Sequence, residues 1–438
     1  MEKVGKNPGR KEIEITELSE YIGQVVTLHG SIYKVRKMSG FCFVILRTAR
    51  DTVQCVCDRQ EVMAELQEEA CVELTAMVIG EERAKAGFEL HIQGMKVLSR
   101  PQAQMPIVMN QKRIEASLEH KLDYRPLTLR NEKERAVFKL QEGILRGFRK
   151  FFEEEGFTEI HSPKIVCAGA EGGANIFQLD YFGRNAYLAQ SPQFYKQMMV
   201  GVFDRVFETA PVFRAEKHNT KRHLNEYTSL DFEMGYIDGF EDIMAMETGF
   251  LQYTMKLLET EYKTELELLN ITLPNVEKIP CVRFDEAKNR VAEKYDRQFK
   301  NPFDLEPEEE VLIGRYFKEE YDSDFVFVTH YPSKKRPFYA MDDPADTTYT
   351  LSFDLLFKGL EITTGGQRIH DYHELMEKIE KRGMETEGME HYLSAFKHGM
   401  PKHGGLGIGL ERLTMQLIGE ENVREATLFP RDLSRLEP

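Results

Sequence analysis

Residues 213–226, FRAEKHNTKRHLNE, carry charges at a spacing that could hold a polyanion. Arg214 and Glu216 alternate with Phe213 and Ala215, so a β-strand would direct both charged side chains to one face. The loop that follows is basic and contains Lys217, Lys221, Arg222 and His223. Charges that share a face in this way bind a polyanion, pair with each other, or point into water. The segment by itself leaves a phosphate site and a solvated hairpin both open.

Two carboxylates lie on either side of a predicted tight turn in residues 353–368, FDLLFKGLEITTGGQR. If Phe357 pairs with Leu360, then Asp354 and Glu361 point to the same face of the hairpin. Paired carboxylates of this kind suit Mg²⁺ that carries nucleotide phosphates. A solvated hairpin is the alternative.

A run of glycines at residues 404–409 leads into a helical pattern that contains Arg412. The run fits neither the dinucleotide-binding signature nor the P-loop signature. We interpret it as a strand whose missing side chains let a flat ligand lie against the backbone, or else as tight strand packing. Arg412 would then lie in the first turn of the helix, where phosphates bind well. Arg368, after two further glycines, could clamp a carboxylate bidentately.

The composition excludes several classes of protein. With 41% hydrophobic and 30% charged residues, the 438-residue chain is typical of a globular enzyme with two or three domains. Its net charge of −15 argues against a surface coated for nucleic acid. No apolar run reaches the roughly 18 residues of a membrane span, and the N-terminal residues lack the apolar core of a signal peptide. The six cysteines are scattered. We therefore expect a cytoplasmic protein without a membrane segment, in which Cys55 and Cys57 are core residues.

Residues 13–100 predict five short strands, with a helical stretch at 58–70 between the third and the fourth. This order is that of the OB-fold, a common oligonucleotide binder; an SH3-like barrel is the alternative. Residues 30–50 add a basic surface without acidic residues, which contains Lys34, Arg36, Lys37, Arg47, Arg50 and the aromatic residues Tyr33, Phe41 and Phe43. We predict an N-terminal OB-fold β-barrel domain at residues 1–103 and a hinge or linker at 104–130.

Residues 131–438 predict an α+β domain of mostly antiparallel sheet flanked by helices. It opens with a helix from Asn131 to about residue 155, whose apolar residues recur at helical spacing. This apolar stripe is either a core face or a dimer seam. Its three aromatic residues favour a dimer, because a single shallow contact would not need so many of them. They are Phe138, Phe148 and Phe152.

Together these segments resemble the aspartyl-tRNA synthetases, a family of class II aminoacyl-tRNA synthetases, in their compact archaeal and eukaryotic form. Residues 213–234 are similar to the second signature motif of class II, and residues 403–419 to the third. Four stretches are similar to aspartyl enzymes in particular: EGGANIF, LAQSPQFYKQ, LEITTGGQRIH and LFPRDLSRLEP. The resemblance covers residues 13–438. It implies a class II catalytic domain and an aspartate–tRNA ligase that uses ATP, L-aspartate and tRNA(Asp), with tRNA(Asn) as a further candidate.

The resemblance implies roles for five residues at the ATP site. Arg214 binds the α-phosphate, and Glu216 accepts the adenine amino group. Tyr227 and Arg412 stack on opposite faces of the purine. His223 reaches the outer phosphates.

The same resemblance implies that Mg²⁺ enters with ATP and is held by Asp354, Glu361 and Thr364. Relatives often have serine at the position of Thr364, so its part in metal binding stays open. Arg214, Glu361 and Arg412 are the implied catalytic residues. The two arginines and the metal neutralise charge around the α-phosphorus, and Glu361 acts by holding the metal. No side-chain nucleophile is needed.

For the amino acid, the resemblance implies that Lys196 and Arg368 grip the side-chain carboxylate, with Asp231 orienting Lys196. The other implied aspartate-binding residues are Glu171 in a loop that closes over the site, Ser191 and Gln193 at the α-amino end, and Thr364.

Two further features follow from the resemblance. Phe43, Gln54 and Glu89 match the barrel positions that read the anticodon by stacking and by base-edge hydrogen bonds. The helix after Asn131 and the strand at Pro163 match the dimer interface of the family, which implies a homodimer.

Two alternative functions remain to be separated. An asparaginyl-tRNA synthetase of the same subclass has GQLxxE where this chain has PQFYKQ, and the cation of Lys196 does not suit a neutral amide. A non-catalytic RNA-binding paralogue is expected to have lost residues that this chain keeps, namely Arg214, Glu361, Arg368 and Arg412.

Overall fold

The computed structural model describes residues 15–48, 51–84, 86–167, 175–217, 220–298 and 300–437. The chain forms two compact units. The first contains the residues up to Ser117 together with Pro126–Glu132, and the second contains Leu118–Arg125 together with the residues from Lys133 onward. None of the helices within these ranges is both long and apolar enough to cross a membrane.

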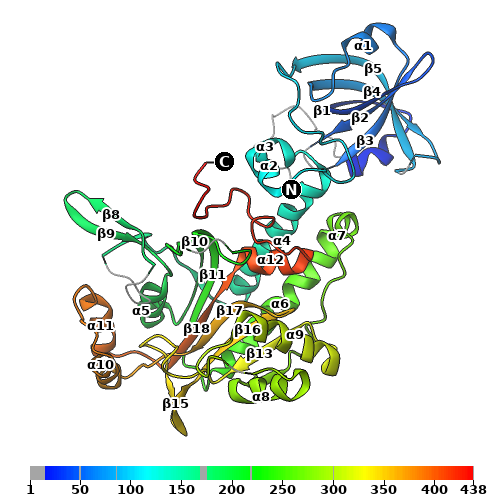
Figure 1. Cartoon of the computed structure of the whole chain (residues 1–438). Coiled ribbons are helices and arrows are strands. Elements are labelled where there is room, and N and C mark those ends of the chain that lie inside the picture. Colours follow the sequence, from blue (N-terminus) through cyan, green and yellow to red (C-terminus); the bar gives the residue numbers. More distant parts are fainter. Residues whose placement is uncertain are drawn as a thin grey trace. The chain divides into compact units, whose positions relative to one another are not determined.

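A closed five-stranded barrel forms the first unit, with the strand order β1-β2-β3-β5-β4 (Figure 1). A 3₁₀ helix at Ile15–Tyr21 precedes it. The strands are β1 (Val25–Lys37), β2 (Cys42–Arg47), β3 (Thr52–Cys57), β4 (Cys71–Gly80) and β5 (Phe88–Ser99). The short helix α1 (Gln60–Glu65) lies between β3 and β4, so the predicted OB-fold order is confirmed.

The interior of the barrel follows from alternation along its strands. On β3, Val53, Cys55 and Cys57 are buried, whereas the residues between them are partly exposed. All six cysteines of the chain are free thiols. The interpretation of Cys55 and Cys57 as core residues is therefore confirmed.

An eight-stranded sheet is the centre of the second unit, with the order β12-β13-β16-β17-β18-β11-β10-β6 (Figure 1). Its neighbours pair antiparallel, except for β6 with β10 and β12 with β13. The strands, in that order, are Cys281–Arg283, Phe325–Thr329, Ser352–Phe357, Leu360–Gln367, His403–Gly409, Glu226–Gly235, Arg205–Phe213 and Thr158–Glu159. Two small sheets contain β7 (Ile165–Val166), β8 (Gln178–Tyr181) and β9 (Arg184–Leu188), and β14 (Asp342–Asp343) and β15 (Asp346–Thr350).

Eleven helices follow the barrel within the described residues. They are α2 (Leu118–Asp123), α3 (Arg125–Thr128), α4 (Glu132–Glu154), α5 (Gln193–Phe203), α6 (Glu241–Glu261), α7 (Lys263–Leu269), α8 (Phe284–Tyr295), α9 (Pro307–Tyr321), α10 (Tyr372–Lys381), α11 (Glu390–Lys397) and α12 (Leu410–Ile418). In Figure 1, α5, α10 and α11 lie toward one end of the sheet, whereas α8 and α9 lie toward the other. This α+β architecture agrees with the predicted fold class.

One face of the sheet is covered by α4 and α6. On β11, Leu230 and Phe232 point into this core, whereas Ser229 and Asp231 line a cavity on the opposite face. Strand alternation thus separates the apolar face of the sheet from the polar face.

Phe148 and Phe152 of α4 belong to this core. Phe148 lies 5.2 Å from Phe250 between ring centroids, and Phe152 lies 4.8 Å from Phe232. Both are 0% exposed. The fold of a single chain already buries these two rings, so they give no support for a dimer, whereas Phe138 is only partly buried.

Candidate functional site

A cavity of about 560 Å³ opens on the polar face of the eight-stranded sheet. It collects side chains from β11, β16, β17, β18, α5, α9 and α12. Thirteen of the residues singled out by sequence line it: Ser191, Gln193, Lys196, Arg214, Glu216, His223, Tyr227, Asp231, Asp354, Glu361, Thr364, Arg368 and Arg412. Glu171 lies outside the described residues.

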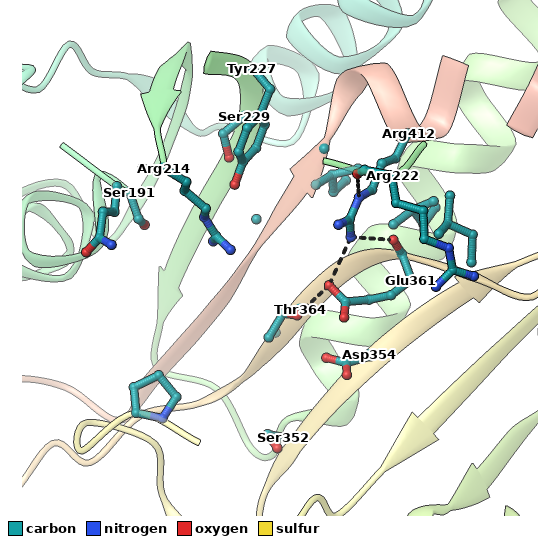
Figure 2. A pocket seen from close by; sticks show the side chains of 18 of the residues that line it. Ser191, Arg214, Arg222, Tyr227, Ser229, Ser352, Asp354, Glu361, Thr364 and Arg412 are labelled. Carbon is teal, nitrogen blue, oxygen red and sulfur yellow. Dashed lines mark hydrogen bonds and ion pairs between the residues drawn. The ribbon is translucent and has the colours of Figure 1, made fainter. Parts of the chain in front are cut away.

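Cationic and aromatic side chains line two sides of this cavity. Figure 2 shows Arg214 and Tyr227 on one side, and Arg222, Glu361 and Arg412 on the other. The Arg214 guanidinium lies 5.8 Å from the centroid of the Tyr227 ring. This arrangement offers an aromatic face beside several phosphate-binding groups.

Arg412, in the segment similar to the third signature motif, contacts the hairpin of β16 and β17 that carries Asp354 and Glu361. It lies in the first turn of α12, as predicted, and its Nη1 donates to the carbonyl oxygen of Glu361 at 3.0 Å. Its Nε donates to the carbonyl oxygen of Arg222 at 3.3 Å. Arg412 therefore holds the basic loop of residues 220–223 against β17.

Strand β18 is rich in glycine, so few of its side chains occupy space at the base of the cavity. Gly405 allows close packing, since a Cβ there would lie 2.2 Å from Glu233 Oε2. At Gly409 the nearest atoms to such a Cβ belong to the Arg412 side chain, at 3.8 Å. Tight strand packing therefore accounts for Gly405, whereas Gly409 leaves space beside Arg412, and the interpretation that a flat ligand lies there stays a prediction.

The hairpin of β16 and β17 has the predicted register at its turn, where Phe357 lies opposite Leu360. A one-residue shift further along the hairpin places Thr364 opposite Asp354. Thr364 therefore lies on the same side as Glu361 and donates its Oγ1 hydrogen to Glu361 Oε1 at 3.4 Å. The β-bulge brings two carboxylates and a hydroxyl to one wall of the cavity.

These oxygen donors fit Mg²⁺ that arrives with a nucleotide. The described ranges contain no group of three His, Cys, Asp or Glu side chains that could hold a metal ion alone. Mg²⁺ is commonly bound by one or two carboxylates, with phosphates and water completing its shell. Glu361 and Asp354, with Thr364 beside them, provide such a partial shell.

Asp354 has a protein partner that the sequence did not indicate. Arg336 Nη2 donates to Asp354 Oδ1 at 2.7 Å, and both side chains are buried. Burial raises the pKa of Asp354 to about 6, against the opposing effect of Arg336. Asp354 is therefore the counter-ion of an arginine as well as a candidate metal ligand.

A second set of charges lies at the α5 side of the cavity. Lys196 Nζ donates to Asp231 Oδ1 at 2.9 Å and to the carbonyl oxygen of Leu406 at 2.7 Å. Arg368 Nε donates to Glu233 Oε1 at 2.9 Å, and Lys196 Nζ lies 3.4 Å from Glu233 Oε2. The expected contact between Lys196 and Asp231 is thus present.

Glu233 changes the charge balance expected from the sequence. Burial raises the pKa of this carboxyl, but Arg368 and Lys196 outweigh that effect and hold it below the ordinary value. Lys196, Arg368 and Asp231, the residues that the resemblance implied, would by themselves give a net positive pocket. With Glu233 included, two cations and two carboxylates give a formal charge of zero, so that net positive charge is absent. The signal was available, since Glu233 follows Asp231 by two residues on one strand.

Glu216 and His223 lie close together near the mouth of the basic loop. His223 Nε2 is 3.7 Å from Glu216 Oε2. Burial and the Arg412 cation lower the pKa of His223, which favours its neutral form. Arg222 is therefore a stronger candidate than His223 for the positive charge that binds a phosphate in this loop.

Arg222 is fixed by a carboxylate that no sequence motif indicated. Its Nη1 donates to Glu310 Oε2 at 3.1 Å. Burial and the neighbouring Glu361 carboxylate raise the pKa of Glu310 to about 7. Glu310 is on α9, 88 residues from Arg222, so local spacing could not have revealed the pair.

The predicted anticodon residues lie together on the outside of the barrel. Gln54 Nε2 donates to Glu89 Oε2 at 3.1 Å, and Phe43 is on the neighbouring strand β2 with its ring 5.3 Å from that of Phe41. These groups offer one aromatic face and two hydrogen-bonding side chains on one surface.

The basic surface around them is smaller than the sequence suggested. Arg47 is buried and donates to both oxygens of Glu69 at 3.1 and 2.9 Å, so it is not available to phosphates. Tyr33 is also buried and donates to the carbonyl oxygen of Met109. Arg50 lies outside the described residues.

Two family models match the chain. Residues 117–433 match the tRNA synthetases class II (D, K and N). Residues 26–98 match the OB-fold nucleic acid binding domain.

Relatives are similar along nearly the whole chain. The aspartate–tRNA(Asp/Asn) ligase of Deinococcus radiodurans is 46% identical over 428 residues, which cover 96% of this chain and 98% of that protein. The aspartate–tRNA(Asp/Asn) ligase of Thermus thermophilus is 44% identical and covers 97% of this chain and 99% of its own length. The aspartate–tRNA(Asp) ligase of Pyrococcus furiosus is 39% identical, with coverage of 97% and 98%.

Solved structures include enzymes of both amino-acid specificities. The asparaginyl-tRNA synthetase of Pyrococcus horikoshii with asparaginyl-adenylate superimposes with a TM-score of 0.90 at 32% identity, over 98% of this chain and 100% of that one. The aspartyl-tRNA synthetase of Entamoeba histolytica has a TM-score of 0.87 at 30% identity, with coverage of 98% and 93%.

Proposed function

Since the chain belongs to the class II tRNA synthetases of the D, K and N group, we propose that it is an aspartate–tRNA ligase. It activates L-aspartate with ATP and transfers it to the 3′ end of tRNA(Asp). The observation that carries this choice of amino acid is the buried pair of cations, Lys196 and Arg368, at one end of the cavity. Relatives at 46% and 44% identity are named as aspartate ligases, which supports the same choice.

In the first step, the α-carboxylate of aspartate attacks the α-phosphorus of ATP and pyrophosphate leaves. Arg214 and Arg412 neutralise the charge that develops on the phosphates, and Tyr227 stacks on the adenine. Glu216 accepts the adenine amino group, and His223 donates to the outer phosphates. When bound, Mg²⁺ supplies positive charge to the phosphates, and Asp354, Glu361 and Thr364 would hold it.

At the amino-acid end, Lys196 and Arg368 bind the side-chain carboxylate of aspartate. Ser191 and Gln193 line the α-amino end, and we propose Glu171 as a further aspartate-binding residue. In the second step, a 3′-terminal ribose hydroxyl of the tRNA attacks the carbonyl carbon of the mixed anhydride, the acyl–phosphate bond breaks and AMP leaves. This step needs no nucleophilic side chain.

We propose that the barrel binds the anticodon. Phe43 stacks on a base, and Gln54 and Glu89 bind base edges. In this assignment residues 1–103 are the anticodon-binding domain, 104–130 the linker and 131–438 the catalytic domain.

We also propose a cytoplasmic homodimer. The reduced state of all six cysteines suits the cytoplasm. The dimer rests on the likeness of residues 132–166 to the interface motif of the family, since Phe148 and Phe152 are buried within one chain. A monomer by light scattering at micromolar concentration would contradict it.

An ATP–pyrophosphate exchange assay tests the activity. We expect exchange that depends on aspartate, and loss of that exchange by a factor of roughly 10² or more in Arg214→Ala and Glu361→Ala. Exchange that depends on asparagine instead would favour the asparaginyl enzymes that resemble the fold. No exchange with either amino acid would favour a non-catalytic RNA-binding protein. Charging of purified tRNA(Asp) and tRNA(Asn) then decides the tRNA range.

A further inference from the structure

One carboxylate on α9 joins two parts of the nucleotide site. Glu310 Oε2 accepts a hydrogen bond from Arg222 Nη1 at 3.1 Å and another from the backbone N–H of Glu361 at 3.2 Å. The Glu310 side chain is only 12% exposed. A single buried oxygen therefore fixes both the basic loop and the strand that carries the candidate metal ligand.

The position of Glu310 is itself held by close packing. At Gly314, one turn further along α9, a Cβ would lie 2.4 Å from the backbone nitrogen of Gly359 in the hairpin turn. At Gly359, a Cβ would lie 2.7 Å from Val311 Cα. Helix α9 is thus packed directly on the turn of the carboxylate hairpin, which keeps Glu310 opposite Glu361.

Arg222 has few other contacts that could hold its guanidinium in place. Its Nη2 reaches the carbonyl oxygen of Gly359 at 3.5 Å, the limit of a hydrogen bond. Without Glu310, a long and flexible side chain would have to be ordered when a ligand binds, at a cost in conformational entropy. Ordering it in advance strengthens binding.

We propose that Glu310 is a positioning residue for ATP, which orients Arg222 and Glu361 toward the outer phosphates and their metal ion. The inference rests on the proposed function, because it assigns this carboxylate to the nucleotide half of that site. Glu310 acts through the two groups that donate hydrogen bonds to it, the Arg222 guanidinium and the backbone N–H of Glu361, and does not contact the nucleotide.

Two substitutions separate this role from direct metal binding. Glu310→Ala removes the acceptor, whereas Glu310→Gln keeps an oxygen that can accept both hydrogen bonds but removes the charge. Glu309→Ala is the matched control. Glu309 is the preceding residue of α9, is 1% exposed, and pairs with Lys288 at 3.0 Å away from the cavity.

The measurement is calorimetric binding of ATP with Mg²⁺ to the full chain, together with KM values for ATP and aspartate in exchange. Loss of a charge-assisted hydrogen bond predicts that Glu310→Ala weakens ATP binding about 10- to 100-fold. The KM for aspartate should stay within about threefold of wild type, and Glu310→Gln should recover most of the ATP affinity. Glu309→Ala should lower the unfolding temperature without changing ATP affinity.

Three results would overturn the proposal. ATP affinity could be unchanged in Glu310→Ala, or reduced equally in Glu309→Ala, which would reduce Glu310 to a structural residue of α9. Glu310→Gln could be as weak as Glu310→Ala, but only in the presence of Mg²⁺, which would make Glu310 a metal ligand. The calorimetry does not depend on the amino acid, so wild-type protein that binds ATP but shows no aspartate-dependent exchange would reject the proposed function and still test Glu310.

Discussion

Replacement of Lys196 by methionine tests how the cavity selects its amino acid. Methionine keeps much of the length of the lysine stem but removes the ammonium group, which lies 2.9 Å from Asp231 Oδ1 and 3.4 Å from Glu233 Oε2. In the wild type these two carboxylates are balanced by Lys196 and Arg368. The variant has one cation for two carboxylates, so its formal charge is −1.

The size of the effect follows from this change of charge. One unit charge at about 4 Å from the substrate carboxylate contributes about 4 kcal/mol at an effective dielectric constant of about 20. That energy corresponds to a factor of roughly 10³ in kcat/KM for aspartate. Proton uptake by Glu233, which would have lost one of its two cations, would relieve part of it, so we expect a loss of about 10²- to 10³-fold. Asparagine is neutral and does not lose this charge interaction, so the ratio of kcat/KM for aspartate to kcat/KM for asparagine should fall by a similar factor.

The assay is ATP–pyrophosphate exchange with aspartate and with asparagine. Lys121→Met is a matched control, because Lys121 also lies between two carboxylates, at 3.0 Å from Glu134 and 3.2 Å from Glu425, and does not line the cavity. The control should keep both rates. If Lys196→Met keeps the wild-type ratio of the two amino acids, the pocket has been assigned wrongly.

Three further outcomes can be measured. Phe43→Ala should lower tRNA charging and leave aspartate-dependent exchange unchanged; a fall in exchange would place the anticodon site elsewhere. Burial, together with the charge of Asp354, raises the pKa of Glu247 from 4.5 to about 8. Between these two pH values the folded protein keeps a proton that the unfolded chain releases. The free energy of unfolding therefore falls as the pH rises from about 4.5 through 8. Glu247→Gln should therefore gain stability relative to wild type between pH 5 and pH 8, on the order of 3 kcal/mol, visible as a growing difference in denaturation midpoint; a constant difference would contradict the raised pKa. Gly405→Ala should destabilise the protein by about 1–3 kcal/mol, since its Cβ would lie 2.1 Å from the Phe232 carbonyl oxygen. Gly94→Ala is the control and should not destabilise it, because a Cβ there meets no atom within 4 Å. Equal midpoints of the two variants in thermal unfolding would refute this.

The sequence by itself determined the features that depend on neighbouring residues. Alternation along the strands and the helical stretch between the third and the fourth were enough to predict the order of the barrel. The two-residue turn at 358–359 set the register next to it in the hairpin of β16 and β17, because such a turn allows only one pairing of the residues on either side, Phe357 with Leu360. The family motifs identified thirteen residues that the fold brings to one cavity.

The tertiary structure alone decided which charges pair with each other. Asp354 is joined to Arg336 across 18 residues, Arg222 to Glu310 across 88, and Arg368 to Glu233 across 135. It also paired Arg47 with Glu69 and enclosed Phe148 and Phe152 of α4 within one chain. The physical reason is that strand and helix periods are properties of the local backbone, whereas a buried charge takes whichever counter-ion the packing of distant segments brings within reach.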